Sequence, residues 1–170
     1  MGDGNGDYNH VMAVDGKWGL GQKAQITGFL AKSATPGITE SDHSYKLQFS
    51  YNWLRWELRA AYTELGEGFN PEVGFLQRSA FRKPEFFIQH RWRPDNLLNL
   101  MELRPHISFR QYSDFKGNLV TSYLHIDNHW VWKSGLEIHT GINYTTEGVV
   151  QDFNLSGVLV PKSTYKHNEM

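Results

Sequence analysis

The run HIDNH, residues 125–129, is the densest group of side chains in this chain that could do chemistry. His125, Asp127 and His129 alternate with other residues, so a β-strand would present all three on one face. His139 could lie opposite them on the next strand. Imidazole and carboxylate groups are common ligands of zinc and other transition metals. A metal site is therefore one interpretation of this face.

The spacing weakens the metal interpretation. Alternate residues of a strand lie about 6.8 Å apart, and residues four apart lie about 13 Å apart. One ion therefore cannot bind His125 and His129 together without a bulge, although a cross-strand His–Asp–His set stays open. A hydrogen-bonded polar network fits the spacing better, because a closed ligand set needs closer spacing. We predict no metal and no cofactor.

Carboxylates on the polar strand faces suggest a second chemistry. Two of Glu57, Glu102, Asp127 and Glu137, about 5 to 9 Å apart, could hydrolyse a glycosidic bond. Their basic neighbours indicate ion pairs instead, and no set of nucleophile, base and orienting group is visible. We predict no catalytic residue, with a glycoside-hydrolase-like enzyme as an alternative. The expected polar network comprises Arg55, Glu57, Arg59, Arg104, His125, Asp127, His129 and His139.

The elements that must position these side chains are strands. Apolar and polar residues alternate with a period of two through most of the chain, and no convincing helical pattern appears. In YKLQFSYNW, residues 45–53, the odd positions are aromatic or apolar and the even positions are polar. The next strand follows almost at once, which predicts a tight hairpin. The expected strands span residues 8–14, 24–33, 44–52, 54–65, 84–93, 100–113, 119–132, 136–146 and 152–160.

We predict a single all-β unit, an antiparallel up-and-down meander of about eight or nine strands. Its connections fall into two sets that a meander places at opposite ends. One set spans residues 15–23, 52–54, 94–99 and 133–135, and the other spans 34–43, 66–83, 114–118 and 147–151. The longest connection lies in the second set. Strands of about 10 residues with unequal ends are typical of outer-membrane barrels.

Composition narrows the class of protein. The chain has 170 residues, a net charge of −1 and no cysteine, which indicates neither a nucleic-acid partner nor a disulfide framework. Its mean hydropathy is −0.54, and no run of about 18 apolar residues would form a membrane helix. The start MGDGNGDYNH does not read as a signal peptide.

Alternation alone does not tell a membrane barrel from a soluble sheet, because each has one apolar and one polar face. Aromatic residues near strand ends, such as Tyr51, Trp53, Trp130 and Trp132, favour interfacial girdles and hence a membrane barrel. The alternative is a soluble all-β glycan-binding module in which the aromatic stripe stacks on sugars.

The longest connection contains an unusually apolar and rigid motif. It comprises Gly68, Phe69, Asn70, Pro71, Glu72, Val73, Gly74 and Phe75. Pro71 fixes its own φ and pushes Asn70 toward an extended conformation. We predict that Phe69, Val73 and Phe75 pack the loop inward as a structural cap.

Two long motifs, GFNPEVGFLQR at residues 68–78 and GNLVTSYLHIDNHWVWKSGLEIHTGINYTTEGV at residues 117–149, carry a family resemblance. They resemble domain-of-unknown-function family 5916, a family of bacterial outer-membrane proteins. The resemblance spans residues 8–165. It implies the C-terminal β-barrel region, which in full-length members follows a domain similar to carbohydrate-binding module family 9.

The resemblance implies a segment from the middle of a longer barrel in the cell outer membrane. The carbohydrate-binding-like domain and the final strands would lie outside it. Outer-membrane lipid is the implied partner, and carbohydrate would bind through the missing domain. The implied role is an anchor or a conduit without catalysis. Lys162 and Ser163 depart from the family pattern, in which Pro and Gly are expected.

Overall fold

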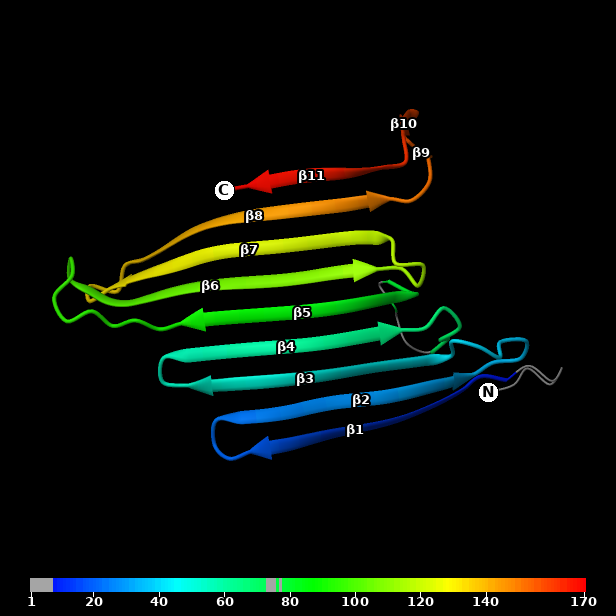
Figure 1. Ribbon diagram of the computed structural model, residues 1–170, viewed down its shortest axis with the longest axis horizontal. Coiled ribbons are helices and arrows are strands. Elements are labelled where there is room, and N and C mark those ends of the chain that lie inside the picture. The colour runs from blue at the N-terminus through cyan, green and yellow to red at the C-terminus, as the bar shows by residue number, and fades with distance from the viewer. Residues whose placement is uncertain (1–7, 73–75, 77) are drawn as a thin grey trace.

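The computed structural model describes residues 8–72, 76 and 78–170. The described chain is all-β, and Figure 1 shows one antiparallel sheet in which each strand lies beside the next. Its strands are β1 (His10–Leu20), β2 (Ala24–Ala34), β3 (His43–Trp53), β4 (Trp56–Leu65), β5 (Phe81–His90), β6 (Leu100–Ser113), β7 (Leu119–Trp132), β8 (Glu137–Val149) and β11 (Ser163–Glu169). A separate hairpin contains β9 (Phe153–Leu155) and β10 (Val158–Val160). The predicted nine-stranded meander is therefore confirmed, as an open sheet in which β1 and β11 are edge strands.

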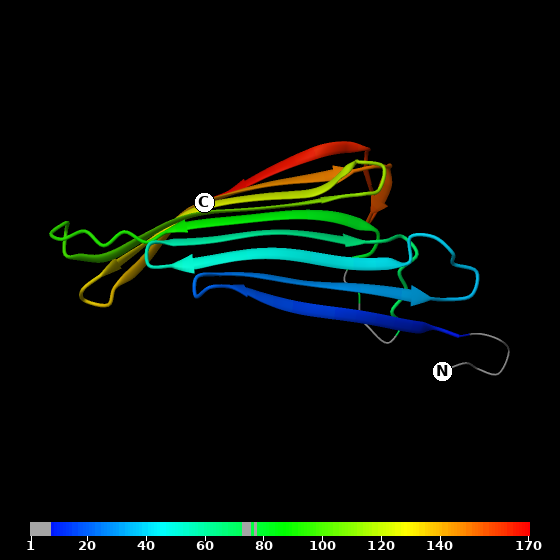
Figure 2. The ribbon, with the colours of Figure 1, turned by 60° about the horizontal axis from the view of Figure 1, so that its bottom comes forward.

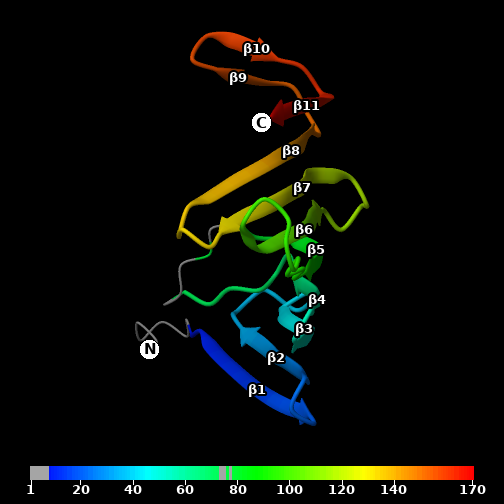
Figure 3. The ribbon, with the colours of Figure 1, turned by 90° about the vertical axis from the view of Figure 1, so that its left-hand side faces the viewer.

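The sheet is curved, and its two faces differ in chemistry. In Figure 3 the strands form an arc, with the described part of the β4–β5 connection on the concave side. There the backbone N–H of Asn70 donates to Ser33 Oγ at 3.0 Å, and Arg78 Nη1 donates to Thr121 Oγ1 at 3.1 Å. Ser33 and Thr121 therefore mark the concave face, and the strand register carries this assignment across the sheet.

The convex face is apolar and the concave face is polar. In β3, Leu47 and Phe49 lie on the convex face, whereas Lys46 and Gln48 lie on the concave face. The structure has one layer, because no second sheet or helix covers either face of the part described. Among the described residues, the only buried apolar side chains are Ala31, Leu65, Leu100 and Leu103. The fold thus lacks the packed interior with which a soluble domain buries an apolar face.

The two sets of connections lie at opposite ends, as predicted. The short β1–β2, β3–β4 and β7–β8 turns lie at one end together with the β5–β6 connection. The other end carries the remaining connections, including the longest one, between β4 and β5 (Figure 2). The tight hairpin between β3 and β4 is confirmed, because Trp53 pairs with Trp56. Leu54 in this turn has a left-handed φ of 39°.

Two strand predictions were wrong. The expected strand at 152–160 is the β9–β10 hairpin, since Ser156 and Gly157 both have positive φ and reverse the chain, as two-residue hairpins require. The ninth strand of the sheet is β11, which pairs with β8. The first strand extends to Leu20 rather than ending at 14, because pairing with β2 continues through Gly16 and Gly19.

The described part of the β4–β5 connection folds inward. Gly66 and Gly68 donate backbone hydrogen bonds to the carbonyls of His43 and Ser41 at 2.8 and 2.9 Å, and Phe69 is half-buried. Asn9 Nδ2 donates to the Asn70 carbonyl at 2.8 Å, which ties the loop to the start of β1. These residues follow an inward path. Val73, Gly74 and Phe75 lie outside the described residues, so the cap formed by Phe69, Val73 and Phe75 stays a prediction.

The close approach of this loop predicts a sharp effect of substitution. In Gly66→Ala the new methyl carbon would lie 1.9 Å from the Ser41 carbonyl oxygen, a backbone atom that cannot rotate away. We expect a loss of about 1–3 kcal/mol in the free energy of unfolding, measured by urea denaturation with tryptophan fluorescence. Gly16→Ala, whose methyl meets nothing within 4 Å, is the control. Equal losses in the two variants would contradict the close packing.

The β6–β7 turn is organised by Asp114. Its Oδ1 accepts hydrogen bonds from the backbone N–H groups of Lys116 and Asn118 at 2.9 and 2.8 Å. Its Oδ2 accepts one from Asn118 Nδ2 at 2.7 Å. The Asn118 side-chain hydrogen bond is the largest cause that holds the pKa of Asp114 below its ordinary value.

A pH dependence follows from this lowered pKa. The carboxylate stabilises the fold above the unfolded-state pKa, about 3.9, and this contribution is lost as the pH falls through the lower folded-state pKa. We expect Asn118→Ala to raise the pKa of Asp114 and to unfold at lower urea than the parent at pH 7. The difference should shrink below about pH 4. Carboxyl carbon NMR titration measures the pKa directly, and an unchanged value in the variant would contradict the assignment.

Candidate functional site

The concave face of β6, β7 and β8 gathers four histidines around Asp127. The register places His106 of β6 directly opposite Asp127 and places Gly141 opposite it on the other side. A methyl group at Gly141 would lie 3.1 Å from the Asp127 Cβ and Cγ atoms. Glycine at that position therefore leaves room for the aspartate, whose side chain is only 7% exposed.

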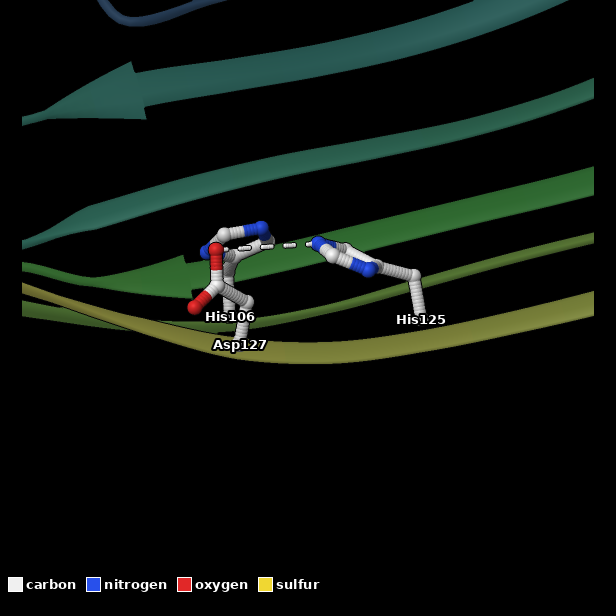
Figure 4. A group of neighbouring side chains, drawn as sticks. All are labelled: His106, His125 and Asp127. Carbon is white, nitrogen blue, oxygen red and sulfur yellow. Dashed lines mark ion pairs between the residues drawn. The ribbon is translucent and has the colours of Figure 1, made fainter. Parts of the chain in front are cut away.

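The histidines form two groups that share Asp127. His106 and His125 form one group with it, and His129 and His139 form the other. In each group, one ligand atom from each residue lies within 4.8 Å of the others. Figure 4 shows the first group, in which His106 stands beside the carboxylate and His125 reaches toward it. The cross-strand arrangement left open by the spacing is the one that the fold produces.

Hydrogen bonds orient both imidazoles of the first group. His106 Nδ1 lies 3.3 Å from the Arg104 carbonyl, and His125 Nδ1 lies 2.6 Å from Asn143 Oδ1. Asn143 Nδ2 in turn donates to Glu169 at 3.4 Å, which agrees with the orientation of its amide. Since a carbonyl oxygen only accepts, both Nδ1 atoms carry a proton. In the neutral rings, Nε2 then holds the free lone pair.

The second group is engaged with carboxylates. His129 Nε2 lies 3.3 Å from Asp127 Oδ2, and its Nδ1 lies 3.1 Å from Glu137 Oε1. His139 Nε2 also lies 3.1 Å from Glu137 Oε1, and the two imidazoles stack with their centroids 3.7 Å apart. Both rings are thus bound to acidic partners.

Ion pairs surround the histidine cluster. Arg104 contacts Glu137 and lies 3.7 Å from Glu102, whose other oxygen accepts from Arg93 at 2.7 Å. A second group lies on β4 and just after β5, where Glu57 pairs with Arg91 at 2.8 Å and with Arg59 at 3.7 Å. No hydrogen bond or ion pair joins the two groups in the part of the chain that the structure describes.

Seven of the eight residues predicted for the polar network lie on the concave face. The prediction for Arg55 was wrong, because it lies exposed in the β3–β4 turn. The sequence had also placed Arg55 in a strand that in fact begins at Trp56. Its backbone carbonyl accepts from Arg91 at 2.7 Å, so the contribution of this residue is structural.

Two residues of the cluster were missing from the predicted network. His106 and Asn143 lie on strands adjacent to β7, and their place depends on which residue each one faces there. The alternation signalled that His106 is on a polar face, but not that it pairs with Asp127. The register between strands supplies that information.

The carboxylates considered for glycoside hydrolysis each have a basic or imidazole partner. Glu57, Glu102 and Glu137 contact arginines, and Asp127 contacts His125 and His129. This arrangement agrees with ion pairing on a polar face. No helix in the described part of the chain is both long and apolar enough to cross a membrane.

No family model, curated protein or solved structure matches this chain. The resemblance to domain-of-unknown-function family 5916 therefore stays a prediction. The features that bear on function are the chemistry of the two sheet faces and the histidine cluster.

The pairing of Arg104 predicts a cost for its removal. Arg104→Met leaves Glu102 and Glu137 without this partner. The side chains of Arg104 and Glu102 are largely buried, so the lost pairing is poorly replaced by water. We expect a loss of about 1–2 kcal/mol in unfolding free energy by urea denaturation. Arg93→Met is the matched control, because its side chain is 73% exposed and its pair is worth about 0–1 kcal/mol. A larger loss in the control would contradict the central place of Arg104.

Proposed function

We propose that this chain forms part of the wall of an outer-membrane β-barrel, with its convex face in lipid and its concave face lining the lumen. The observation that carries the proposal is the uncovered apolar convex face. Exposed apolar side chains on that face include Val14, Trp18, Leu30, Leu47, Phe49, Phe86, Ile107, Ile126 and Ile138. Such a continuous apolar band, opposite a charged face, is the pattern of membrane barrels.

The tryptophans support a membrane interface. All six lie in or beside the strands near the short-turn end, and the register puts them on the convex face. They are Trp18, Trp53, Trp56, Trp92, Trp130 and Trp132. Trp130 Nε1 donates to Thr140 Oγ1 at 2.8 Å, so its polar atom is satisfied on that face. A belt of tryptophan at one level is typical of the lipid–water boundary.

Strand length fits a membrane crossing. Strands β1 to β8 contain 10 to 14 residues. A tilted strand needs about 9–11 residues to cross the hydrocarbon core. The few charged residues on the convex face, including His43, Glu64 and Arg82, lie at the long-loop end and bind one another. That position would place them at the outer boundary of the membrane.

The two unpaired edges support a larger barrel. Strands β1 and β11 each have one neighbour in the sheet, so each leaves a row of backbone groups without sheet partners. Unpaired backbone groups cost several kcal/mol each in hydrocarbon, and membrane barrels avoid them by closing. Further strands on both sides would close this wall. The resemblance to family 5916, with its larger barrel, supports the same interpretation.

The role that we propose is an anchor or conduit for a carbohydrate-binding domain. In family 5916 such a domain precedes the barrel, and it would supply contact with carbohydrate. The concave face would line the passage, where a hollow of about 310 Å³ is bordered by Lys46, Arg59, Glu85 and Arg110. The inward β4–β5 connection would narrow its mouth. We propose no catalysis in this segment.

The distribution of tryptophans also weighs against a soluble glycan-binding module. A sugar platform gathers aromatic rings in one patch, whereas these tryptophans spread along one end from β1 to β7. A girdle explains that spread, because every strand crosses the same boundary.

A paired substitution tests which face meets lipid. Phe49 and Gln48 are adjacent near the middle of β3 and point to opposite faces. Phe49→Arg should weaken folding into phosphatidylcholine vesicles by about 2–4 kcal/mol, because arginine is costly at the bilayer midplane. Gln48→Arg should have a much smaller effect. Urea titration with heat-modifiable gel mobility measures both.

Other outcomes would contradict the membrane proposal. A monomeric protein that stays soluble without detergent, with equal effects of the two arginines, would overturn it. Retention on a glycan column under those conditions would favour the soluble binding module instead.

A further inference from the structure

We propose that His106, His125 and Asp127 bind a divalent transition-metal ion, with Zn²⁺ as the natural probe. The three side chains project from β6 and β7 on the concave face (Figure 4). All three proposed ligands lie on these two strands, and Asn143 of β8 orients His125. The metal proposal is independent of the membrane proposal, and either can fail while the other stands.

The distances between the ligand atoms are close to those of a metal site. One ligand atom from each of the three residues already lies within 4.8 Å of the others. Zinc holds nitrogen and oxygen ligands at about 2.0–2.2 Å, which places tetrahedral ligands about 3.4 Å apart. Closing this gap requires rotation of the side chains and no backbone movement, because His106 and Asp127 are paired residues and His125 is two positions away.

The second argument is the orientation of the rings. A metal-binding histidine almost always donates its other N–H to an oxygen, which fixes the tautomer. His106 does so toward the Arg104 carbonyl and His125 toward Asn143 Oδ1. Both Nε2 lone pairs are therefore free to bind a metal.

The third argument is an unsatisfied oxygen. Asp127 Oδ1 is buried and has no hydrogen-bond partner, and the side chain is more than nine-tenths buried. An unpaired buried carboxylate oxygen is costly and rare. The oxygen nearest His125 is Oδ2, 3.8 Å from Nε2, so a cation held by both oxygens of this carboxylate and by the two imidazoles would remove that cost.

The same reasoning separates the two groups around Asp127. Both nitrogens of His129 face carboxylates, and the side chain of His139 is 56% exposed and bound to Glu137. A metal there would compete with Glu137 for both rings. His106 and His125 have no such competitor among their described contacts.

The chemistry of the site follows from its ligand count. Two imidazoles and one carboxylate with an open fourth position form a set that zinc and iron proteins use. The open position faces the concave side, so the ion could exchange with solution or hold an anionic or water ligand. The ion would also join β6 to β7.

Titration of the full chain, folded in detergent, with Zn²⁺ tests the proposal. Isothermal calorimetry should show one tight site, and Co²⁺ should give visible d–d absorption. His106→Ala and His125→Ala should each weaken Zn²⁺ binding more than about 100-fold, since even loss of an orienting partner costs about 10–100-fold. His139→Ala is the matched control, because His139 is not among the three proposed ligands. It should change the Zn²⁺ affinity by less than about twofold, well below the loss expected for a ligand or an orienting residue.

A measurement on the unsubstituted chain keeps the test independent of variant folding. Imidazole nitrogen NMR should show that Zn²⁺ shifts His106 and His125 and leaves His139 unchanged. Asn143→Ala should weaken binding about 10-fold as a positioning residue. Absence of tight Zn²⁺ binding, or loss of binding in His139→Ala with retention in His106→Ala, would overturn the proposal.

Discussion

The hydrogen-bonded register of adjacent antiparallel strands is the constraint on which the rest of this structure depends. Because side chains alternate along each strand, one residue of slip between β3 and β4 would exchange Phe49 with Gln48 across the sheet. In the described sheet the pairing shifts at the two ends of the β6–β7 ladder, between Leu100 and Glu102 and between Tyr112 and Ser113, and the central pairs keep one register. It therefore keeps apolar groups on the convex face and charged groups on the concave face. Close contacts reinforce it, as where Gly141 admits the Asp127 side chain and Gly66 lies against Ser41.

A single-layer sheet with one apolar and one polar face has few buried side chains to stabilise it. Only Ala31, Leu65, Leu100 and Leu103 are buried apolar residues in the described chain, so packing of side chains against side chains contributes little. The backbone ladder, the concave ion pairs and the inward loop hold the sheet together. What remains exposed is the convex face, whose apolar area is too continuous to be an ordinary wet surface. The membrane proposal assigns that face to lipid, and the edges of β1 and β11 to further strands.

On the concave face, the strand register brings polar side chains of separate strands together into a site. Histidines on three strands meet at one aspartate because the pairing of β6, β7 and β8 brings their polar positions into line. Arg104 and Glu137 then neutralise each other beside it. The hydrogen bonds to Arg104 and Asn143 leave two Nε2 lone pairs beside Asp127, whose Oδ1 is buried and unsatisfied. That combination turns a polar network into a candidate metal site.

The local pattern of the sequence was enough to predict an all-β meander, most strands within a few residues, and the chemistry of each face. A period of two is a property of consecutive residues, so the chemistry of each strand face can be predicted without knowing which strands pair. The ninth strand was misplaced because left-handed Ser156 and Gly157 make a local hairpin inside an apparently continuous strand. Arg55 was misplaced because a two-residue turn displaced the start of β4. Only the tertiary structure decided that His106 faces Asp127 and that the polar face is the concave one, because strand pairing and curvature depend on residues far apart in the chain.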